Sequence, residues 1–170
     1  MIIREAKLTD AEKLYEMLCR LDEETDYMLY EPGERQKVSP NSERLKSYLE
    51  EASSGTDLML VAENDSGEIV GFLGAERGKL NRVQHTAYIV TGIREAYRRQ
   101  GIGTRFFKQL EEWARSNGIV RLELTVECPN IAAKNLYEKN GFVVEGLRSK
   151  SMRVNGEFVD EYNMCKIIEL

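Results

Sequence analysis

The sequence Arg98-Arg-Gln-Gly-Ile-Gly103 follows an apolar segment that predicts a strand and precedes a segment that predicts a helix. The helix signal is a set of apolar residues at the helical period, namely Phe106, Phe107, Leu110, Trp113 and Ala114. The first turn of a helix has unpaired N–H groups, and glycines let an anion approach the backbone closely. With two added arginines, the segment predicts a pyrophosphate site. A glycine turn before a solvent-exposed basic helix start explains the same six residues, and the segment alone leaves both interpretations open.

The overall charge makes any anion site a local feature. The chain has 170 residues, with 24 lysines and arginines against 29 aspartates and glutamates, and a net charge of −5. Such a protein is not expected to bind nucleic acid through its general charge. Hydrophobic residues make up 42% of the sequence, and no repeat, low-complexity tract or long linker divides it. We therefore predict a single domain over residues 1–170.

The cysteines and the first residues bear on the compartment. Cys19, Cys128 and Cys165 are an odd number without C-x-x-C or Cys/His spacing, which argues against a disulfide framework and a structural zinc site. The N-terminal sequence becomes charged at Arg4, and the longest apolar run, residues 58–62, is too short to span a membrane. We expect reduced thiols, a cytoplasmic protein, no membrane partner and no bound metal.

The remaining sequence predicts a mixture of strands and helices. A capping box at residues 9–12 begins a first helix with the buried face Ala11, Leu14, Tyr15 and Leu18. Residues 22–36 are predicted as a loop, and Ser39-Pro40 begins a second helix. Strands are predicted at residues 2–3, 57–64, 69–76, 84–93, 121–126, 142–147 and 162–168, and a further helix at 131–139. This order predicts an α/β fold with a single mixed, mostly antiparallel sheet and helices on both faces.

A second motif accompanies the glycine segment. Asn130 is followed by Ala133, then by Leu136-Tyr137 and by Gly141-Phe142. Together with Arg98-x-x-Gly101-x-Gly103, in this order and separation, the pattern resembles that of the GCN5-related N-acetyltransferases, the GNAT superfamily. The resemblance covers most of the chain. It implies a splayed sheet in which two diverging central strands admit the pantetheine arm of acetyl-CoA.

The resemblance also implies which residues bind acetyl-CoA. The main chain of the strand end would hydrogen-bond the pantetheine, at Thr91, Gly92 and Ile93. The pyrophosphate would be held by Arg98, Arg99, Gly101, Ile102, Gly103 and Thr104. Many members have glycine where this chain has Arg99. We interpret the Arg99 side chain as an extra phosphate contact. Asn130 would hydrogen-bond the cofactor, although its place before a helix also suits an N-cap.

The implied reaction is direct transfer of the acetyl group. A neutral primary amine would attack the thioester carbonyl, and a strand amide would stabilise the oxyanion. Tyr137 would protonate the departing thiolate, since a phenol of pKa about 10 can serve a thiol of pKa about 8.5; as a core aromatic it would have no such role. An acetyl intermediate on Cys128 is the covalent alternative, but nothing in the sequence marks an activated thiolate. No base is assigned, because His85, Glu63 and Glu76 suit solvent-facing strand ends.

Acidic residues gather between the first two predicted helices, namely Asp22, Glu23, Glu24, Asp26, Glu31 and Glu34. This family commonly builds its acceptor site there, and an amine acceptor is cationic. We therefore interpret Glu31 and Glu34 as acceptor contacts, while a solvated acidic loop explains the same residues. Polyamines, aminoglycoside-like amines and the amino groups of peptides or proteins all fit this acidic segment as acceptors. Dimers are common in the family, so the resemblance is also compatible with a homodimer.

Three function classes remain compatible with the sequence. The leading one is an acetyl-CoA-dependent N-acetyltransferase. A non-catalytic acyl-CoA-binding module would share the pyrophosphate motif. A nucleotide-dependent oxidoreductase or kinase comes third, because the chain has neither a full G-x-G-x-x-G nor a G-x-x-x-x-G-K-[ST] sequence.

Overall fold

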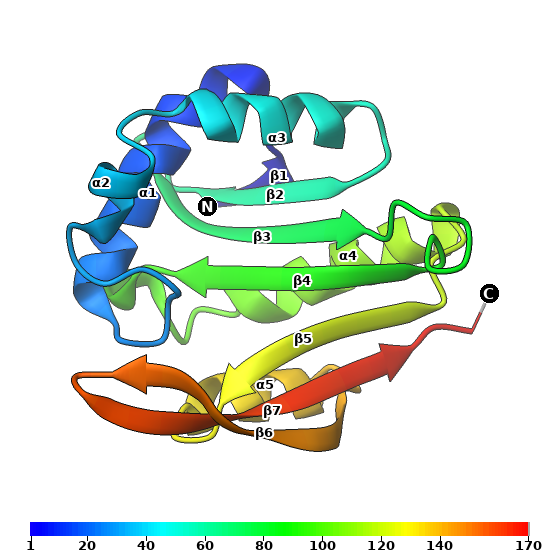
Figure 1. Cartoon of the computed structure of the whole chain (residues 1–170). Coiled ribbons are helices and arrows are strands. Elements are labelled where there is room, and N and C mark those ends of the chain that lie inside the picture. The colour runs from blue at the N-terminus through cyan, green and yellow to red at the C-terminus, as the bar shows by residue number, and fades with distance from the viewer. Residues whose placement is uncertain (170) are drawn as a thin grey trace. The chain divides into compact units, whose positions relative to one another are not determined.

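The computed structural model describes residues 1–169 as a seven-stranded sheet with helices (Figure 1). The strand order is β1-β2-β3-β4-β5-β7-β6. The strands are β1 (Ile2–Glu5), β2 (Leu58–Glu63), β3 (Ile69–Arg77), β4 (Thr86–Ile93), β5 (Arg121–Glu127), β6 (Val143–Val154) and β7 (Glu157–Ile167). The helices are α1 (Ala11–Glu24), α2 (Glu34–Val38), α3 (Glu43–Ser53), α4 (Ile102–Ser116) and α5 (Ile131–Lys139), with short 3-10 turns at Leu8–Asp10 and Glu95–Tyr97.

The sheet is mixed, as predicted. β4 and β5 pair in parallel over Thr86–Tyr88 and Arg121–Glu123. The pairs β1–β2, β2–β3, β5–β7 and β6–β7 are antiparallel. This mixed, open sheet with helices confirms the predicted fold class. Of the helices within residues 1–169, none combines the length and the apolar character needed to cross a membrane.

The chain forms two compact units, each built from two segments. The first unit contains Met1–Glu76 and Val90–Phe106, and the second contains Arg77–Ile89 and the chain from Phe107 onward. Because the boundaries fall inside β4 and α4, these two elements contribute residues to both units. That residues 1–170 act as a single domain stays a prediction.

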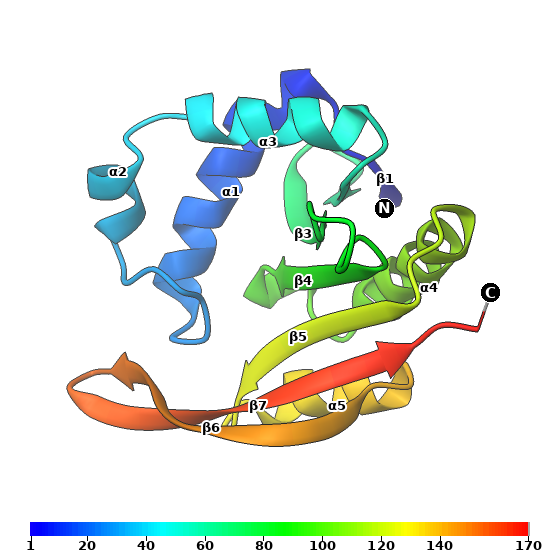
Figure 2. The same cartoon turned by 45° about the vertical axis from the view of Figure 1, so that its right-hand side comes forward.

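The core of the first unit lies between two helices, α1 and α3, and the strands β2 and β3 (Figure 2). Apolar residues recur along α1 at the helical period and form one buried stripe. This core includes Leu14, Met17, Leu18, Leu21, Leu49, Met59, Val61 and Phe72. Tyr15, predicted to belong to the buried face, is only half-buried at the edge of the stripe, where its hydroxyl donates to the Ser39 carbonyl at 2.6 Å.

The second unit contains the ribbon of β5, β7 and β6 together with α5. Leu122, Leu124 and Val126 of β5 are buried, as their alternation predicts. An aromatic cluster joins Phe107 of α4 to Tyr137 of α5, with ring centroids 5.6 Å apart, and to Phe142, at 5.5 Å. These edge-to-face contacts hold the Tyr137 ring in one orientation.

The predicted helix starts were wrong in two places. The capping box predicted between Thr9 and Glu12 does not form, because Leu8–Asp10 make a 3-10 turn and Asp10 occupies the N-cap position of α1. Asp10 accepts the Lys7 N–H at 2.7 Å and pairs with Arg4. The helix expected at Ser39-Pro40 begins only at Glu43. The predicted loop at residues 22–36 contains the end of α1 and most of the short helix α2.

The last hairpin is longer than predicted. β6 and β7 run to Val154 and Glu157, around a turn in which Asn155 and Gly156 have positive φ values of 50° and 87°. Two such residues are typical of the tight turn that matches strand twist. Most side chains of β6 are exposed. The strand therefore lacks the apolar alternation by which its length could be predicted.

Candidate functional site

The glycine segment forms a backbone cradle at the start of α4. Arg99 and Gly101 both have left-handed backbone conformations, with φ values of 59° and 77°. Left-handed residues in such a loop turn backbone N–H groups toward a common side, which creates a concave anion site. The Arg105 N–H donates to the Gly101 carbonyl at 3.1 Å. The N–H groups of Ile102, Gly103 and Thr104 precede that bond, so they have no partner inside the helix.

Arg99 is an exposed arginine in a strained conformation. A left-handed backbone costs an ordinary L-residue about 1–2 kcal/mol, whereas glycine adopts it freely. This cost gives the physical reason for the glycine that many members of the resembled family carry at this position. Strain of this kind persists mostly where a function uses it. An anion contact from the guanidinium would be such a use.

Arg98 connects the cradle to the end of β4. Its Nε donates to the Ile93 carbonyl at 2.9 Å, and the side chain is exposed. This bond uses only one of the guanidinium nitrogens. The two terminal nitrogens can still bind a phosphate oxygen.

The end of β4 is held from two sides within the first unit. The Thr91 hydroxyl donates to the Phe72 carbonyl of β3 at 2.8 Å. A Cβ atom on Gly92 would lie 2.4 Å from Leu21 Cδ2 of α1, a distance that real structures do not tolerate. Any other residue at position 92 would therefore require Leu21 and the Phe72 ring to move. The strand end predicted to bind pantetheine, Thr91 to Ile93, is thus a firmly packed part of the structure.

Tyr137 is a buried residue of the second unit, with 8% of its surface exposed. Burial, with a smaller contribution from Tyr88, raises the pKa of Tyr137 to about 12. The phenol is therefore a weaker acid than the unperturbed tyrosine assumed from the sequence. It remains fully protonated at neutral pH, which a proton donor requires.

Asn130 is the N-cap of α5. Its Oδ1 accepts the Ala133 N–H at 3.2 Å. The cap occupies the side-chain oxygen, so any hydrogen bond from Asn130 to a cofactor would come from its amide nitrogen.

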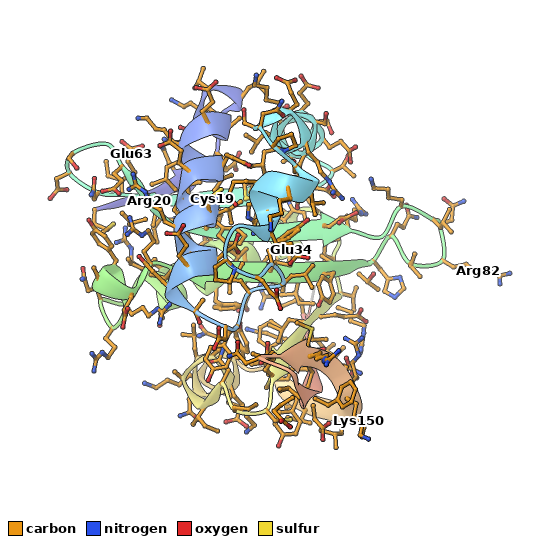
Figure 3. All side chains as sticks on the ribbon, turned by 60° about the vertical axis from the view of Figure 1, so that its left-hand side comes forward. Cys19, Arg20, Glu34, Glu63, Arg82 and Lys150 are labelled. Carbon is orange, nitrogen blue, oxygen red and sulfur yellow. The ribbon has the colours of Figure 1, made fainter. Side chains whose placement is uncertain are left out.

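The acidic segment between α1 and α3 is only partly available for an acceptor. Asp22 is buried and ion-paired with Arg35, at 2.6 Å between Oδ2 and Nε. Glu24 pairs with Arg94 at 2.7 Å. Figure 3 shows Glu34 on α2, where its Oε2 accepts the Glu31 N–H at 2.9 Å. Three of the acidic residues thus have structural partners, while the Glu31 side chain is exposed.

A polar cavity in the second unit was missed by the sequence analysis. It has a volume of about 270 Å³ and is lined by Tyr88, Arg121, Glu123, Leu124, Glu145, Gly146, Asn163 and Met164. Tyr88 also shares a hydrogen bond of 2.9 Å with the Thr125 hydroxyl. Arg121 pairs with Glu145, and this ion pair lowers the pKa of the Glu145 carboxyl. The alternation of Arg121, Glu123 and Thr125 with buried apolar residues was the available signal for this polar face.

The other residues considered for catalysis have ordinary surroundings. Glu63 accepts a hydrogen bond of 2.9 Å from Arg4 Nε, and His85 is exposed. All three cysteines are free thiols, and burial raises the pKa of Cys19 and of Cys165. Within residues 1–169, no group of three or more His, Cys, Asp or Glu side chains is arranged to hold a metal ion.

Two curated relatives match part of the chain. L-amino acid N-acetyltransferase AaaT of Escherichia coli (strain K12) is 30% identical over 105 residues, covering 59% of this chain and 63% of AaaT. N-alpha-acetyltransferase RimI of Mycobacterium tuberculosis (strain ATCC 25618 / H37Rv) is 36% identical over 105 residues, covering 61% of this chain and 63% of RimI. The match therefore spans less than two thirds of either relative.

Solved structures and a family model match the chain more fully. An acetyltransferase of the GNAT family from Streptococcus pneumoniae has a TM-score of 0.91 and 34% identity, covering 99% of both chains. A phosphinothricin acetyltransferase from Sinorhizobium meliloti, solved in complex with acetyl-CoA, has a TM-score of 0.85, with 98% of this chain and 88% of that chain covered. Its identity of 15% supports the fold alone. Because the model of the acetyltransferase (GNAT) family matches residues 12–142, the chain belongs to this family.

Proposed function

We propose that the protein is an acetyl-CoA-dependent N-acetyltransferase. The observation that carries the proposal is the backbone cradle at residues 98–104, which has two left-handed residues, two arginines and the start of a 15-residue helix. This arrangement suits the pyrophosphate of coenzyme A, since free N–H groups and the helix dipole both favour negative charge. Membership of the acetyltransferase family supports the same ligand, and a neighbour that shares the fold was solved with acetyl-CoA bound.

The cradle residues fit the proposed cofactor. The N–H groups of Ile102, Gly103 and Thr104 and the side chains of Arg98 and Arg99 would hold the pyrophosphate. The main chain of Thr91, Gly92 and Ile93 would orient the pantetheine, and the Asn130 amide nitrogen would add a further hydrogen bond. Bound acetyl-CoA supplies the activated acetyl thioester, and the protein's own groups bind it and handle the protons. No metal is required by this scheme.

Tyr137 is proposed as the proton donor to the departing sulfur. Its pKa of about 12 keeps the hydroxyl protonated at every physiological pH. A free thiol has a pKa of about 8.5, so a thiolate in water would not take this proton efficiently. Desolvation raises the basicity of a thiolate as well. The transfer therefore requires that the sulfur also be shielded from water.

The acceptor is proposed to be a primary amine, and we favour an α-amino group. The names of both curated relatives, an L-amino acid N-acetyltransferase and an N-alpha-acetyltransferase, support this choice over a polyamine or an aminoglycoside. The exposed Glu31 carboxylate is the acidic group that would attract the cationic amine. A cytoplasmic location and a homodimer stay predictions.

The function is tested by measuring thiol release from acetyl-CoA with free amino acids, short peptides, polyamines and aminoglycosides as acceptors. We expect release with at least one α-amino acceptor, and saturable binding of acetyl-CoA by calorimetry. Thermal shift with acetyl-CoA, ATP and NADH is the matched comparison, because a ligand at 100 times its Kd stabilises a fold by about 2.7 kcal/mol. If acetyl-CoA binds but no acceptor produces thiol release, the non-catalytic acyl-CoA-binding module is favoured. If acetyl-CoA does not shift the melting temperature, both the enzyme and the binding module are rejected.

A further inference from the structure

We propose that two ion pairs at the end of α1 hold the loop that would bind the acceptor amine and couple it to the strand that would bind acetyl-CoA. Asp22–Arg35 positions the acceptor segment, defined as residues 25–33 between α1 and α2. Glu24–Arg94 joins that segment to the strand end that would bind acetyl-CoA. The inference rests on the proposed function, and it assigns roles to residues that would touch neither substrate.

The Asp22–Arg35 pair closes the acceptor segment into a loop. Arg35 donates to both Asp22 oxygens, at 2.6 and 3.0 Å, and only 1% of the Asp22 side chain and 13% of the Arg35 side chain are exposed. The Arg35 guanidinium also lies 4.4 Å from the centre of the Tyr30 ring, which belongs to the segment. A two-pronged, shielded pair of this kind holds a fixed geometry. The start of α2 is thus tied to α1, and the chain between them is held at both ends.

The Glu24–Arg94 pair ties the other end of the segment to β4. Arg94 donates to Glu24 Oε1 from Nε and from its terminal nitrogen, at 2.9 and 2.7 Å. Glu24 Oε2 accepts the Glu95 N–H at 2.8 Å. Glu24 is the last residue of α1, and Arg94 directly follows Ile93. The Glu24 carboxylate, just before the acceptor segment, therefore bonds directly to Arg94 and Glu95, the two residues that follow the proposed pantetheine strand.

Packing supplies a second link between the same two places. The Cβ position of Gly92 faces Leu21 Cδ2 at 2.4 Å and Met28 Sδ at 3.5 Å. Met28 lies inside the acceptor segment. A shift of the Gly92 backbone on cofactor binding would therefore be felt by α1 and by the segment. The polar contacts of Glu24 and the apolar contact of Met28 both connect the proposed pantetheine strand to the acceptor segment. Acetyl-CoA binding is therefore expected to protect this segment further from opening, with Glu24 carrying part of the effect.

The two pairs predict different kinetic signatures. Two variants test the Asp22–Arg35 pair. Arg35→Lys keeps the positive charge but loses the two-pronged contact with Asp22, and Tyr30→Leu removes the aromatic ring beside Arg35 but leaves the ion pair. Each should raise the acceptor KM by about tenfold while the acetyl-CoA KM stays within twofold. For the other pair, Glu24→Gln should raise both KM values by about fivefold or more. Lys46→Gln, which breaks an exposed ion pair of α3, is the matched control and should change neither.

Hydrogen exchange gives a readout that does not depend on turnover. In the wild type, acetyl-CoA should slow exchange of the amides in residues 25–33. Glu24→Gln should retain acetyl-CoA binding at saturating ligand but lose this protection, and Arg35→Lys should raise exchange in the segment without ligand. Melting temperatures are measured for every variant, so that unfolding is recognised.

The outcomes distinguish a failure of the proposed function from a failure of the roles proposed for the two ion pairs. A wild type that neither binds acetyl-CoA nor releases thiol rejects the proposed function itself. A wild type that is active, with Arg35→Lys or Tyr30→Leu raising both KM values or neither, rejects the role of Asp22–Arg35. Equal protection of residues 25–33 in the wild type and in Glu24→Gln rejects the link through Glu24.

Discussion

At the scale of the residue, the strained arginine of the cradle is the most informative position. Arg99 keeps a left-handed backbone at φ 59° although glycine would do so without cost. Arg98 has an ordinary extended backbone, with φ −68° and ψ 161°, and its Nε is already bonded. The two arginines therefore differ in what they contribute. Arg98 connects the cradle to the strand, whereas Arg99 has no such structural benefit to offset its strain.

Arg99→Gly is expected to separate stability from binding. Loss of the left-handed strain, partly offset by the greater freedom of glycine in the unfolded chain, should raise the free energy of unfolding by about 0.5 kcal/mol. Loss of one phosphate contact should weaken acetyl-CoA binding by about tenfold. Urea unfolding and calorimetric titration measure the two effects. Arg99→Lys is the control, since it keeps the strain and the charge, and an unchanged Kd in Arg99→Gly would remove Arg99 from the site.

Tyr137→Phe tests the proton donor. The variant keeps the ring contacts with Phe107 and Phe142 but has no proton to donate. We expect kcat to fall by about 100-fold or more, with the Kd of acetyl-CoA within twofold, because general acid catalysis is typically worth that much. Steady-state thiol release and equilibrium binding give the two values. Full activity in the variant would leave Tyr137 as a packing residue.

At the scale of the element, the contact of α1 with β4 decides how the candidate site is held. Gly92 lets α1 approach so closely that Leu21 occupies the space of a missing side chain. The same helix then ends in Asp22 and Glu24, whose partners lie on α2 and just beyond β4. The end of α1 therefore both belongs to the core and anchors the acceptor segment through its two ion pairs.

Gly92→Ala should destabilise the protein. The added methyl would overlap Leu21 at 2.4 Å, and overpacking of this kind costs about 1–3 kcal/mol in the free energy of unfolding. Leu21→Ala leaves room for the methyl, so the double variant should be more stable than the sum of the two single effects by about 1 kcal/mol. Urea unfolding of all four proteins tests this. Additive effects would show that the two residues do not share the space.

At the scale of the whole molecule, stability depends on charge at both ends of the pH range. Side-chain bonds to Arg4, together with smaller effects, lower the pKa of Asp10, and bonds to Lys166 and Arg115 lower the pKa of Glu111. A carboxyl with a lowered pKa contributes its full stabilisation above its ordinary pKa, and this contribution is lost as the pH falls from there through the lowered pKa. Tyr137 has the opposite sign, since its raised pKa makes the folded state hold a proton that the unfolded state releases.

The expected stability profile is therefore a plateau with two slopes. The free energy of unfolding should decline as the pH falls below about 4.5, where free carboxyls take up protons. It should decline again above the ordinary thiol pKa of 9.0, because burial raises the pKa of Cys19 and Cys165, and further between the ordinary tyrosine pKa of 10.0 and about 12, the raised pKa of Tyr137. In Tyr137→Phe the alkaline slope should be shallower, although burial also raises the pKa of Tyr48. Urea unfolding at several pH values measures the profile, and identical alkaline slopes in both proteins would contradict it.

Much of the fold was predictable because its signals are local. The helix at Ile131–Lys139 was predicted with the observed bounds, and the buried side of β5 followed from its alternation. Predictions failed where other contacts displaced the expected ones or where the sequence has no pattern to read. The capping box expected of Thr9 and Glu12 did not form, because Leu8–Asp10 make a 3-10 turn in which Asp10 bonds to Arg4 and to the Lys7 N–H. The length of β6 was missed because its exposed side chains have no apolar pattern.

The sequence by itself determined the order of the strands and of the longer helices, the family and the glycine segment, since turns and apolar periods depend on neighbours along the chain. Only the tertiary structure decided how the acidic residues are used. Asp22 meets a partner 13 residues away and Glu24 one 70 residues away, so two carboxylates of the acidic segment form ion pairs within the fold. It also decided that the Tyr137 phenol has a pKa of about 12. Long-range ion pairs and burial depend on how the chain packs in three dimensions, so they could not be predicted from the spacing of residues along the sequence.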